Sequence, residues 1–319
     1  MAGSSIFWLS QHGASRKLRL EVSADWENHV PLTSTANAAP SHISTAAGSQ
    51  DPDELIAARY RDGMAATGPW NEVFATILSH RSVRAFSPAP LPPGTLQQLV
   101  AAAQSASTSS NLQTWSEVAV EDPDRKARLA ALGSGQKHIV QCPLYLIWLV
   151  DLARLDRVAG ERQMWLQGLD YLEPFIVGIV DAALAAQNAA IALESLGLGF
   201  VYIGAMRNHP EKVAAELGLP LHVMALFGMC VGYPDPAVPT GVKPRLPQSA
   251  VLHHEQYSAA PQSAVFIAYD LRVREFQREQ GMTEIDWTQQ ATNRVKTAES
   301  LHGRDRMREA LANLGFRLR

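Results

Sequence analysis

Apolar residues along this chain gather in short runs of strand length and in longer stretches with helical spacing. Apolar positions with helical spacing predict helices over residues 53–64, 72–79 and 95–106, and in the charged tail from about 264. Strands and helices alternate, which indicates an α+β or α/β protein. The four strand-length runs, each bounded by turn residues, cover residues 116–122, 143–151, 200–205 and 223–234.

The longest apolar stretch, residues 174–197, is small or apolar on almost every side. Asp181, Gln187, Asn188 and Glu194 interrupt it, and charged side chains are costly in lipid. The pattern therefore predicts a helix buried on several sides, in the core or in a subunit interface, and not a membrane span.

The first fifty residues differ in composition from the rest. Residues 33–50 are mostly Ser, Thr and Ala, with no apolar period that could bury a face. The apolar run from Ile6 to Leu9 is shorter than the ~7–15 residues of a secretory signal. We therefore predict a disordered extension over residues 1–52 and one domain over residues 53–319.

Composition and charge exclude several function classes. The 319 residues hold 28 Lys+Arg and 31 Asp+Glu, a net charge of −3, whereas general binders of nucleic acid or anionic membranes carry a basic excess. The two cysteines, Cys142 and Cys230, lie in apolar runs and are expected to be buried structural thiols. A reducing compartment, the cytoplasm, is the simplest fit.

Common catalytic motifs are absent from the sequence. It contains no GxxxxGK[ST] phosphate loop, no GxGxxG turn, no GxSxG elbow, no HExxH and no CxxC. His253 and His254 are adjacent, but no carboxylate or further histidine stands at helix-face spacing from them. This favours a solvated loop over a metal site.

Cationic residues at the element boundaries remain as candidates. Arg81 and Arg84, with Ser82 between them, can converge on one anion. Pro244 favours an extended Lys243, which would place the side chains of Lys243 and Arg245 on the same side. For either pair alone, a solvated surface face is the simpler interpretation.

Three further segments could contact a flat or polar ligand. Residues 105–111 end a helix with a cluster of hydroxyls, although serine-rich turns are usually only turns. Residues 133–138 form a glycine-hinged loop whose Gln136 amide could read a heterocycle. Residues 202–205 end a strand with small residues, where backbone N–H groups could approach a ring closely.

Taken in order, six motifs resemble those of the FMN-dependent nitroreductase superfamily, and most closely its branch of oxygen-insensitive NADPH nitroreductases and NADPH-flavin oxidoreductases. The resemblance implies a three-layer α+β fold with a central, mainly antiparallel sheet flanked by helices. It also implies an interlocked homodimer with one FMN in each of two interface clefts. The motifs are HRSVRAF (80–86), STSSNLQTWS (107–116), GSGQKH (133–138), AQNAAIALESLGLGFVYIGAMRN (186–208), LFGMCVGYP (226–234) and KPRLP (243–247).

The resemblance further implies which residues hold FMN. Lys243 and Arg245 match the family's later cationic pair, which holds the phosphate together with an N-terminal arginine. A phosphomonoester carries roughly −1.5 to −2 charge at neutral pH, so several cations can meet it without a Rossmann turn. No catalytic side chain and no metal are implied. The expected cofactor-binding residues are His80, Arg81, Ser82, Arg84, Ser107, Thr108, Ser109, Gln136, Tyr202, Ile203, Gly204, Ala205, Lys243 and Arg245.

The implied function is an FMN-dependent NAD(P)H oxidoreductase that reduces nitroaromatics and quinones by ping-pong hydride transfer through flavin N5. The same site would serve a flavin reductase that supplies reduced FMN to a partner monooxygenase, and the sequence leaves this alternative open. A third interpretation is a flavin-binding sensor without turnover, whose N-terminal segment (Trp8, Trp26) binds a partner. Neither nucleic acid nor membrane is an expected partner.

Two departures from the family pattern bear on the expected contacts. Ala205 stands where the family often has a second glycine, and its methyl group narrows the approach to the ring. Residues 280–300 lack the paired arginines that grip the 2′-phosphate of NADPH in this branch. NADPH is the expected donor and NADH remains possible, with Arg278, Arg294 and Lys296 as candidate substitutes.

Overall fold

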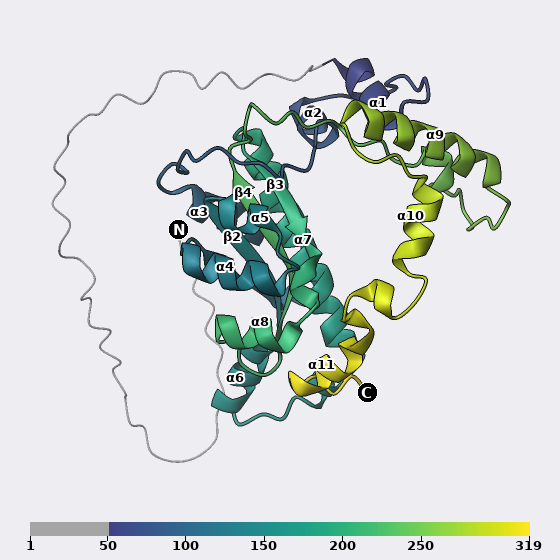
Figure 1. Cartoon of the computed structure of the whole chain (residues 1–319). Coiled ribbons are helices and arrows are strands. Elements are labelled where there is room, and N and C mark those ends of the chain that lie inside the picture. The colour runs from purple at the N-terminus through teal and green to yellow at the C-terminus, as the bar shows by residue number, and fades with distance from the viewer. Residues whose placement is uncertain (1–50) are drawn as a thin grey trace, which may run out of the picture. The chain divides into compact units, whose positions relative to one another are not determined.

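The centre of the fold is a four-stranded antiparallel sheet with the order β1-β2-β4-β3 (Figure 1). The computed structural model describes residues 51–319. Strands β2 and β4 form the middle of the sheet, and an isolated parallel bridge joins Ser82 to Phe200 at the β3 edge. The strands are β1 (Trp115–Val120), β2 (Leu144–Asp151), β3 (Gly199–Ile203) and β4 (Val223–Gly232).

Eleven α-helices surround this sheet within the described residues. Several begin at a side-chain cap: the Asp51, Asn71 and Asp122 carboxylate or amide oxygens accept from backbone N–H groups of the first turn. The helices are α1 (Pro52–Tyr60), α2 (Glu72–Leu78), α3 (Thr95–Gln104), α4 (Pro123–Leu132), α5 (Lys137–Gln141), α6 (Ala153–Glu161), α7 (Leu172–Ser195), α8 (Pro210–Leu217), α9 (Ser263–Glu279), α10 (Trp287–Arg294) and α11 (Met307–Asn313).

Helices cover both faces of the sheet, which gives three layers. On one face, Leu129 of α4, Ile139 of α5 and Val213 of α8 pack with Tyr145 and Ile147 of β2. On the other face, α3 and α7 pack against Leu144, Leu146 and Trp148. Every residue of β2 is buried, which explains why its sequence is a continuous apolar run and not an alternating one.

The predicted fold class is confirmed, and the four expected strands appear within two residues of their predicted bounds. The helices expected over 53–64, 72–79, 95–106 and 174–197 correspond to α1, α2, α3 and α7. The predicted disordered extension, residues 1–52, lies outside the described residues except for Asp51 and Pro52, as does the partner-binding role suggested for Trp8 and Trp26. Cys142 and Cys230 are buried free thiols, as predicted.

Helix α7 has one face in the core and one face exposed. Ala182, Ala185, Ala186, Ala189 and Ala190 are buried under α3 and the sheet. Ile176, Ile179, Val180 and Leu184 are all more than a third exposed, although their spacing forms a single apolar stripe. This helix is long and apolar enough to span a membrane by composition, but its buried alanine face is typical of a core helix.

Candidate functional site

Three cations from two distant segments meet beside the β3 edge of the sheet. Lys243 lies close to Arg84 and Arg245: burial and then the charges of Arg84 and Arg245 lower the pKa of its ammonium group. All three residues nevertheless keep an exposed surface, because the burial of Lys243 is only partial. Among residues 51–319, no carboxylate forms an ion pair with any of them. We call Arg84, Lys243 and Arg245 the phosphate cluster.

The segment from His80 to Arg84 is fixed to the sheet and to helix α7. His80 Nδ1 lies 2.7 Å from the Glu194 carboxylate near the end of α7. Arg81 donates from Nε to Thr240 Oγ1 at 3.0 Å, and Val83 N donates to the Phe200 carbonyl at 2.8 Å. The structure thus separates the motif's roles: His80 and Arg81 have protein partners, and Arg84 is left exposed beside Lys243.

A buried arginine outside the expected set, Arg59 of α1, joins the two cationic segments. Its Nη1 donates to the Lys243 carbonyl at 3.0 Å, and its Nη2 donates to the carbonyls of Leu78 and His80, both at 2.8 Å. Arg59 is only 6% exposed, and burial together with the charge of Arg245 lowers its pKa. Its guanidinium therefore lies behind the phosphate cluster and not within it.

The loop before α5 and the end of β3 lie side by side. Asn208 donates to Ser134 Oγ at 2.9 Å, and the Met206 side chain packs on Gly133. Gln136 donates to the Gly133 carbonyl, so its amide oxygen stays available. Ile203 and Ala205 are buried, and the contact of their backbone with a ring stays a prediction. The Tyr202 ring is 38% exposed.

A second group of cations consists of Arg207 and Arg304, which lie next to Gly204, and Arg294, whose charge acts on both of them. A Cβ on Gly204 would be 3.4 Å from Arg207 Nη2 and 3.8 Å from Arg304 Nη1. Burial lowers the pKa of Arg207 and of Arg304, and the neighbouring arginines lower both further. None of the ion pairs found in residues 51–319 includes these three side chains. We call them the donor cluster.

Neutral partners hold the donor cluster in place. Arg304 Nε donates to Asn208 Oδ1 at 2.8 Å, and Arg207 and Arg294 donate to the carbonyls of Leu226 and Ser300. Arg278, another expected substitute, instead forms a bidentate pair with Glu284 on the surface. Of the three expected substitutes, Arg294 is the one that the described residues place beside Arg207 and Arg304.

The hydroxyl segment 107–109 lies at a different place. Thr108 Oγ1 donates to Asp181 Oδ2 at 2.7 Å, and Ser109 N donates to Asp181 Oδ1 at 3.3 Å. Asp181 and Glu194 are thirteen residues apart on α7, about 20 Å at 1.5 Å per residue. Within one chain, the hydroxyl segment and the segment from His80 to Arg84 are therefore attached to different parts of α7.

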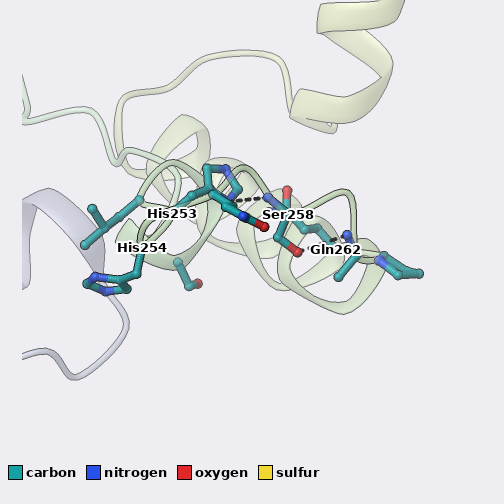
Figure 2. Close-up of a pocket in the computed structure, with 9 residues that line it drawn as sticks. His253, His254, Ser258 and Gln262 are labelled. Atoms are coloured by element: carbon teal, nitrogen blue, oxygen red, sulfur yellow. Dashed lines mark hydrogen bonds between the residues drawn. The ribbon is translucent and has the colours of Figure 1, made fainter.

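Two cavities open near the C-terminal helices. One, of about 420 Å³, is lined by Lys243 and Arg245 together with Tyr60, Tyr269 and Trp287. The other, of about 310 Å³, is formed by the loop around His253 and His254 (Figure 2). There His253 Nδ1 accepts from Ser258 N at 3.3 Å, and no group of metal-ligating side chains is found in residues 51–319.

The described residues fit the FMN expected from the family resemblance. The phosphate cluster offers positive charge that no carboxylate of residues 51–319 neutralises, as a phosphomonoester requires. His138 Nε2 is buried without a hydrogen-bond partner among these residues, and its pKa is lowered by burial and by the charge of Arg84. Gly204 has no side chain, and the Tyr202 ring near it is 38% exposed.

Sequence patterns did not identify Arg59 or Arg304 as site residues. Arg59 is a single arginine in an ordinary amphipathic helix, and its carbonyl partners lie 19 to 184 positions away. Arg304 lies in a charged tail that has many arginines, most of them paired with carboxylates. Arg207 was inside a quoted motif, YIGAMRN, and its place directly after the ring-facing strip was the available signal.

Comparison with known proteins gives a consistent result. The model of the nitroreductase family matches residues 77–233, and that of the nitroreductase family C-terminal domain matches residues 243–319. An FMN reductase (NADPH) of Bacillus subtilis is 38% identical over 244 residues, covering 75% of this chain and 97% of the relative. An oxygen-insensitive NADPH nitroreductase of Salmonella typhimurium is 38% identical over 200 residues, covering 63% and 80%.

Solved structures agree. NfrA2 of B. megaterium has a TM-score of 0.73 at 34% identity and covers 78% of this chain and 100% of its own. The NADPH:FMN oxidoreductase from Vibrio harveyi, complexed with NAD+, has a TM-score of 0.69 at 32% identity, with coverage of 78% and 100%. The sequence resemblance, the three-layer sheet and both family models lead to one conclusion: this chain belongs to the nitroreductase family.

Proposed function

We propose that this protein is an FMN-dependent NAD(P)H oxidoreductase that reduces nitroaromatics and quinones. The observation that carries the proposal is the phosphate cluster, three convergent cations without a carboxylate partner in residues 51–319. Relatives named FMN reductase (NADPH) and oxygen-insensitive NADPH nitroreductase support it. FMN, when bound, would supply a hydride acceptor and donor at N5.

The chain's own residues bind and orient the reactants in this proposal. Arg84, Lys243 and Arg245 hold the phosphate of FMN, and the backbone of residues 203–205 lies beside the ring. Gln136 offers a free amide oxygen to the polar edge of the ring. The donor cluster next to Gly204 accepts the phosphates of the reduced dinucleotide, which favours NADPH because of its additional 2′-phosphate.

The site is completed by a second subunit. Asp181, which binds Thr108, lies about 20 Å along α7 from Glu194, which binds His80, and this separation supports a role of residues 107–109 toward the partner's cofactor. The exposed stripe of Ile176, Ile179, Val180 and Leu184 on α7 is an apolar surface suited to a homodimer interface. Burying it in a homodimer fits a soluble, cytoplasmic enzyme without nucleic-acid or membrane partners.

The direct test is the flavin content and turnover of the purified full-length protein. We expect a yellow protein that contains FMN and oxidises NADPH when a nitroaromatic or a quinone is added. Protein that binds no FMN and oxidises no NADPH after FMN is added would contradict the proposal.

A flavin reductase that releases reduced FMN is the second candidate, supported by the relative named FMN reductase (NADPH). The two activities are separated by saturating the bound flavin and then comparing nitrofurazone, benzoquinone and free FMN as acceptors. A higher kcat/KM for free FMN would favour the reductase. The sensor interpretation has less support, because the named relatives are enzymes.

A further inference from the structure

Helix α1 adds to the site from outside the part of the chain that matches the family. The matched ranges are residues 77–233 and 243–319, and α1 covers Pro52–Tyr60. Its Arg59 is the buried side chain that joins the two cationic segments, and its Tyr60 lines the cavity beside Lys243 and Arg245. The helix is therefore placed to act on the phosphate cluster.

The backbone of residues 243–245 is held from two sides. On one side, Arg59 Nη1 donates to the Lys243 carbonyl, and Arg245 N donates to the Arg59 carbonyl at 2.9 Å. From α9, the buried Tyr269 hydroxyl donates to the Pro244 carbonyl at 2.9 Å. Three consecutive residues thus have a fixed backbone, and the side chains of Lys243 and Arg245 remain exposed.

The same guanidinium fixes the other segment. Its Nη2 donates to the carbonyls of Leu78 and His80, at the end of α2 and the start of the segment that carries Arg84. The negative ends of three carbonyl dipoles therefore point at Arg59. Without it these carbonyls would lie unpaired next to the site of an anion, where they would repel a phosphate.

The attachment of α1 to the domain does not depend on Arg59. Arg61 forms a bidentate pair with Glu279 of α9, with both N–O distances at 2.8 Å, and packs over the Phe276 ring. Arg272 of α9 lies 3.8 Å from Asp62. Replacing Arg59 should therefore leave α1 docked and remove only the bonds to the cationic segments.

We propose that Arg59 is a positioning residue for the phosphate of the cofactor: it sets the distance between the Arg84 segment and the Lys243–Arg245 segment and directs their carbonyls away from the anion. This inference rests on the proposed function, because it assigns a role toward FMN. It predicts that Arg59 contributes to the affinity for the phosphate and not for the ring.

The test compares FMN with riboflavin, which has the same ring and no phosphate. Apoprotein of the wild type, R59M, R59K and the control R278Q, whose arginine pairs with Glu284 on the surface, is titrated with each flavin, and quenching of flavin fluorescence gives Kd. We expect R59M to raise the Kd for FMN about 10-fold or more, with the Kd for riboflavin changed less than about 2-fold. R59K, which keeps the charge, should recover part of the loss, and R278Q should behave as the wild type.

Each outcome decides the question. A wild type that does not bind FMN would contradict the proposed function itself. A wild type that prefers FMN over riboflavin, with the same preference in R59M, would overturn the role of Arg59 alone. Equal losses for both flavins would also overturn it, as would failure of both R59M and R59K to fold by circular dichroism, because Arg59 would then be a residue of the fold.

Discussion

The two edges of the sheet differ in how their charged groups are paired. At the β1 edge, Asp181 of α7 accepts four hydrogen bonds, from Thr108, Ser109 and twice from Thr114. At the β3 edge, Glu194 of the same helix binds His80. The cations of the phosphate cluster have no carboxylate partner in residues 51–319. The carboxylate at the β1 edge is fully hydrogen-bonded by the chain itself, whereas the cations at the β3 edge are available to an anion.

This difference indicates where an anionic ligand would bind. Most arginines of the C-terminal region have carboxylate partners, such as Glu284 for Arg278 and Glu211 for Arg306. Leaving two clusters of arginine and lysine without such partners costs free energy in an isolated chain, because like charges repel. Such an arrangement is typical of a binding site. In the proposed homodimer, the hydroxyls of residues 107–109 would belong to the site of the other subunit.

The largest expected effect is loss of cofactor affinity at the β3 edge. In the double variant K243M/R245M, we expect the Kd for FMN to rise about 1,000-fold, since each charge-assisted contact contributes about 2 kcal/mol. Riboflavin affinity should stay within about 3-fold of the wild type. Fluorescence titration measures both, and an unchanged Kd for FMN would place the phosphate elsewhere.

At the β1 edge the corresponding change should affect stability. In D181N the new amide group cannot accept from all four donors, so we expect the free energy of unfolding to fall by about 3 kcal/mol. Urea unfolding followed by circular dichroism measures it. S105A, which removes an exposed hydroxyl bonded to the Ala101 carbonyl, is the control and should change stability by less than about 0.5 kcal/mol.

The β1 edge also carries a carboxyl group that should make stability depend on pH. Burial raises the pKa of Glu117 to about 7. Since the pKa in the folded state is above that in the unfolded state, the contribution to stability is present at acidic pH and is lost as the pH rises through about 7. Between about pH 5.5 and 8.5 the wild type should lose about 1–2 kcal/mol that E117Q does not lose. Parallel curves for the two proteins would contradict the assignment.

The smallest effect concerns the choice of electron donor. R304M removes one cation of the donor cluster, and we expect the KM for NADPH to rise about 10-fold while the KM for NADH changes less than about 2-fold. R278M is the matched control, because Arg278 is paired with Glu284 on the surface and should leave both values unchanged. Equal losses with both donors would assign Arg304 to the pyrophosphate instead of the 2′-phosphate.

Much of this fold follows from the sequence, because its core elements are strongly patterned. The apolar run of β2 and the long alanine-rich α7 appear close to their predicted bounds. Helices α4, α5, α6 and α8 had no prediction; α4 and α6 carry many charges, and α5 has five residues. Their position depends on packing against the sheet, which local spacing does not encode.

The sequence could predict only those residues of the candidate site that lie in motifs of the family. The expectation that Arg84 would lie near Lys243 and Arg245 agrees with the structure, although their role toward FMN stays a prediction. Arg59 could not be predicted, since its three carbonyl partners come from two distant segments and carbonyls have no sequence signature. The placement of residues 107–109 far from the cluster required the folded helix α7.

In the proposed homodimer, each FMN site uses the phosphate cluster of one subunit and the hydroxyl segment of the other. A mixed dimer tests it most directly, with K243M/R245M in one subunit and S109W in its partner, after each variant homodimer has been shown to lose tight FMN binding. If the site is shared, one of the two sites in the mixed dimer carries both changes and the other carries none. We therefore predict one FMN per mixed dimer, bound with wild-type affinity. A mixed dimer without tightly bound FMN would contradict the sharing of each site between two subunits.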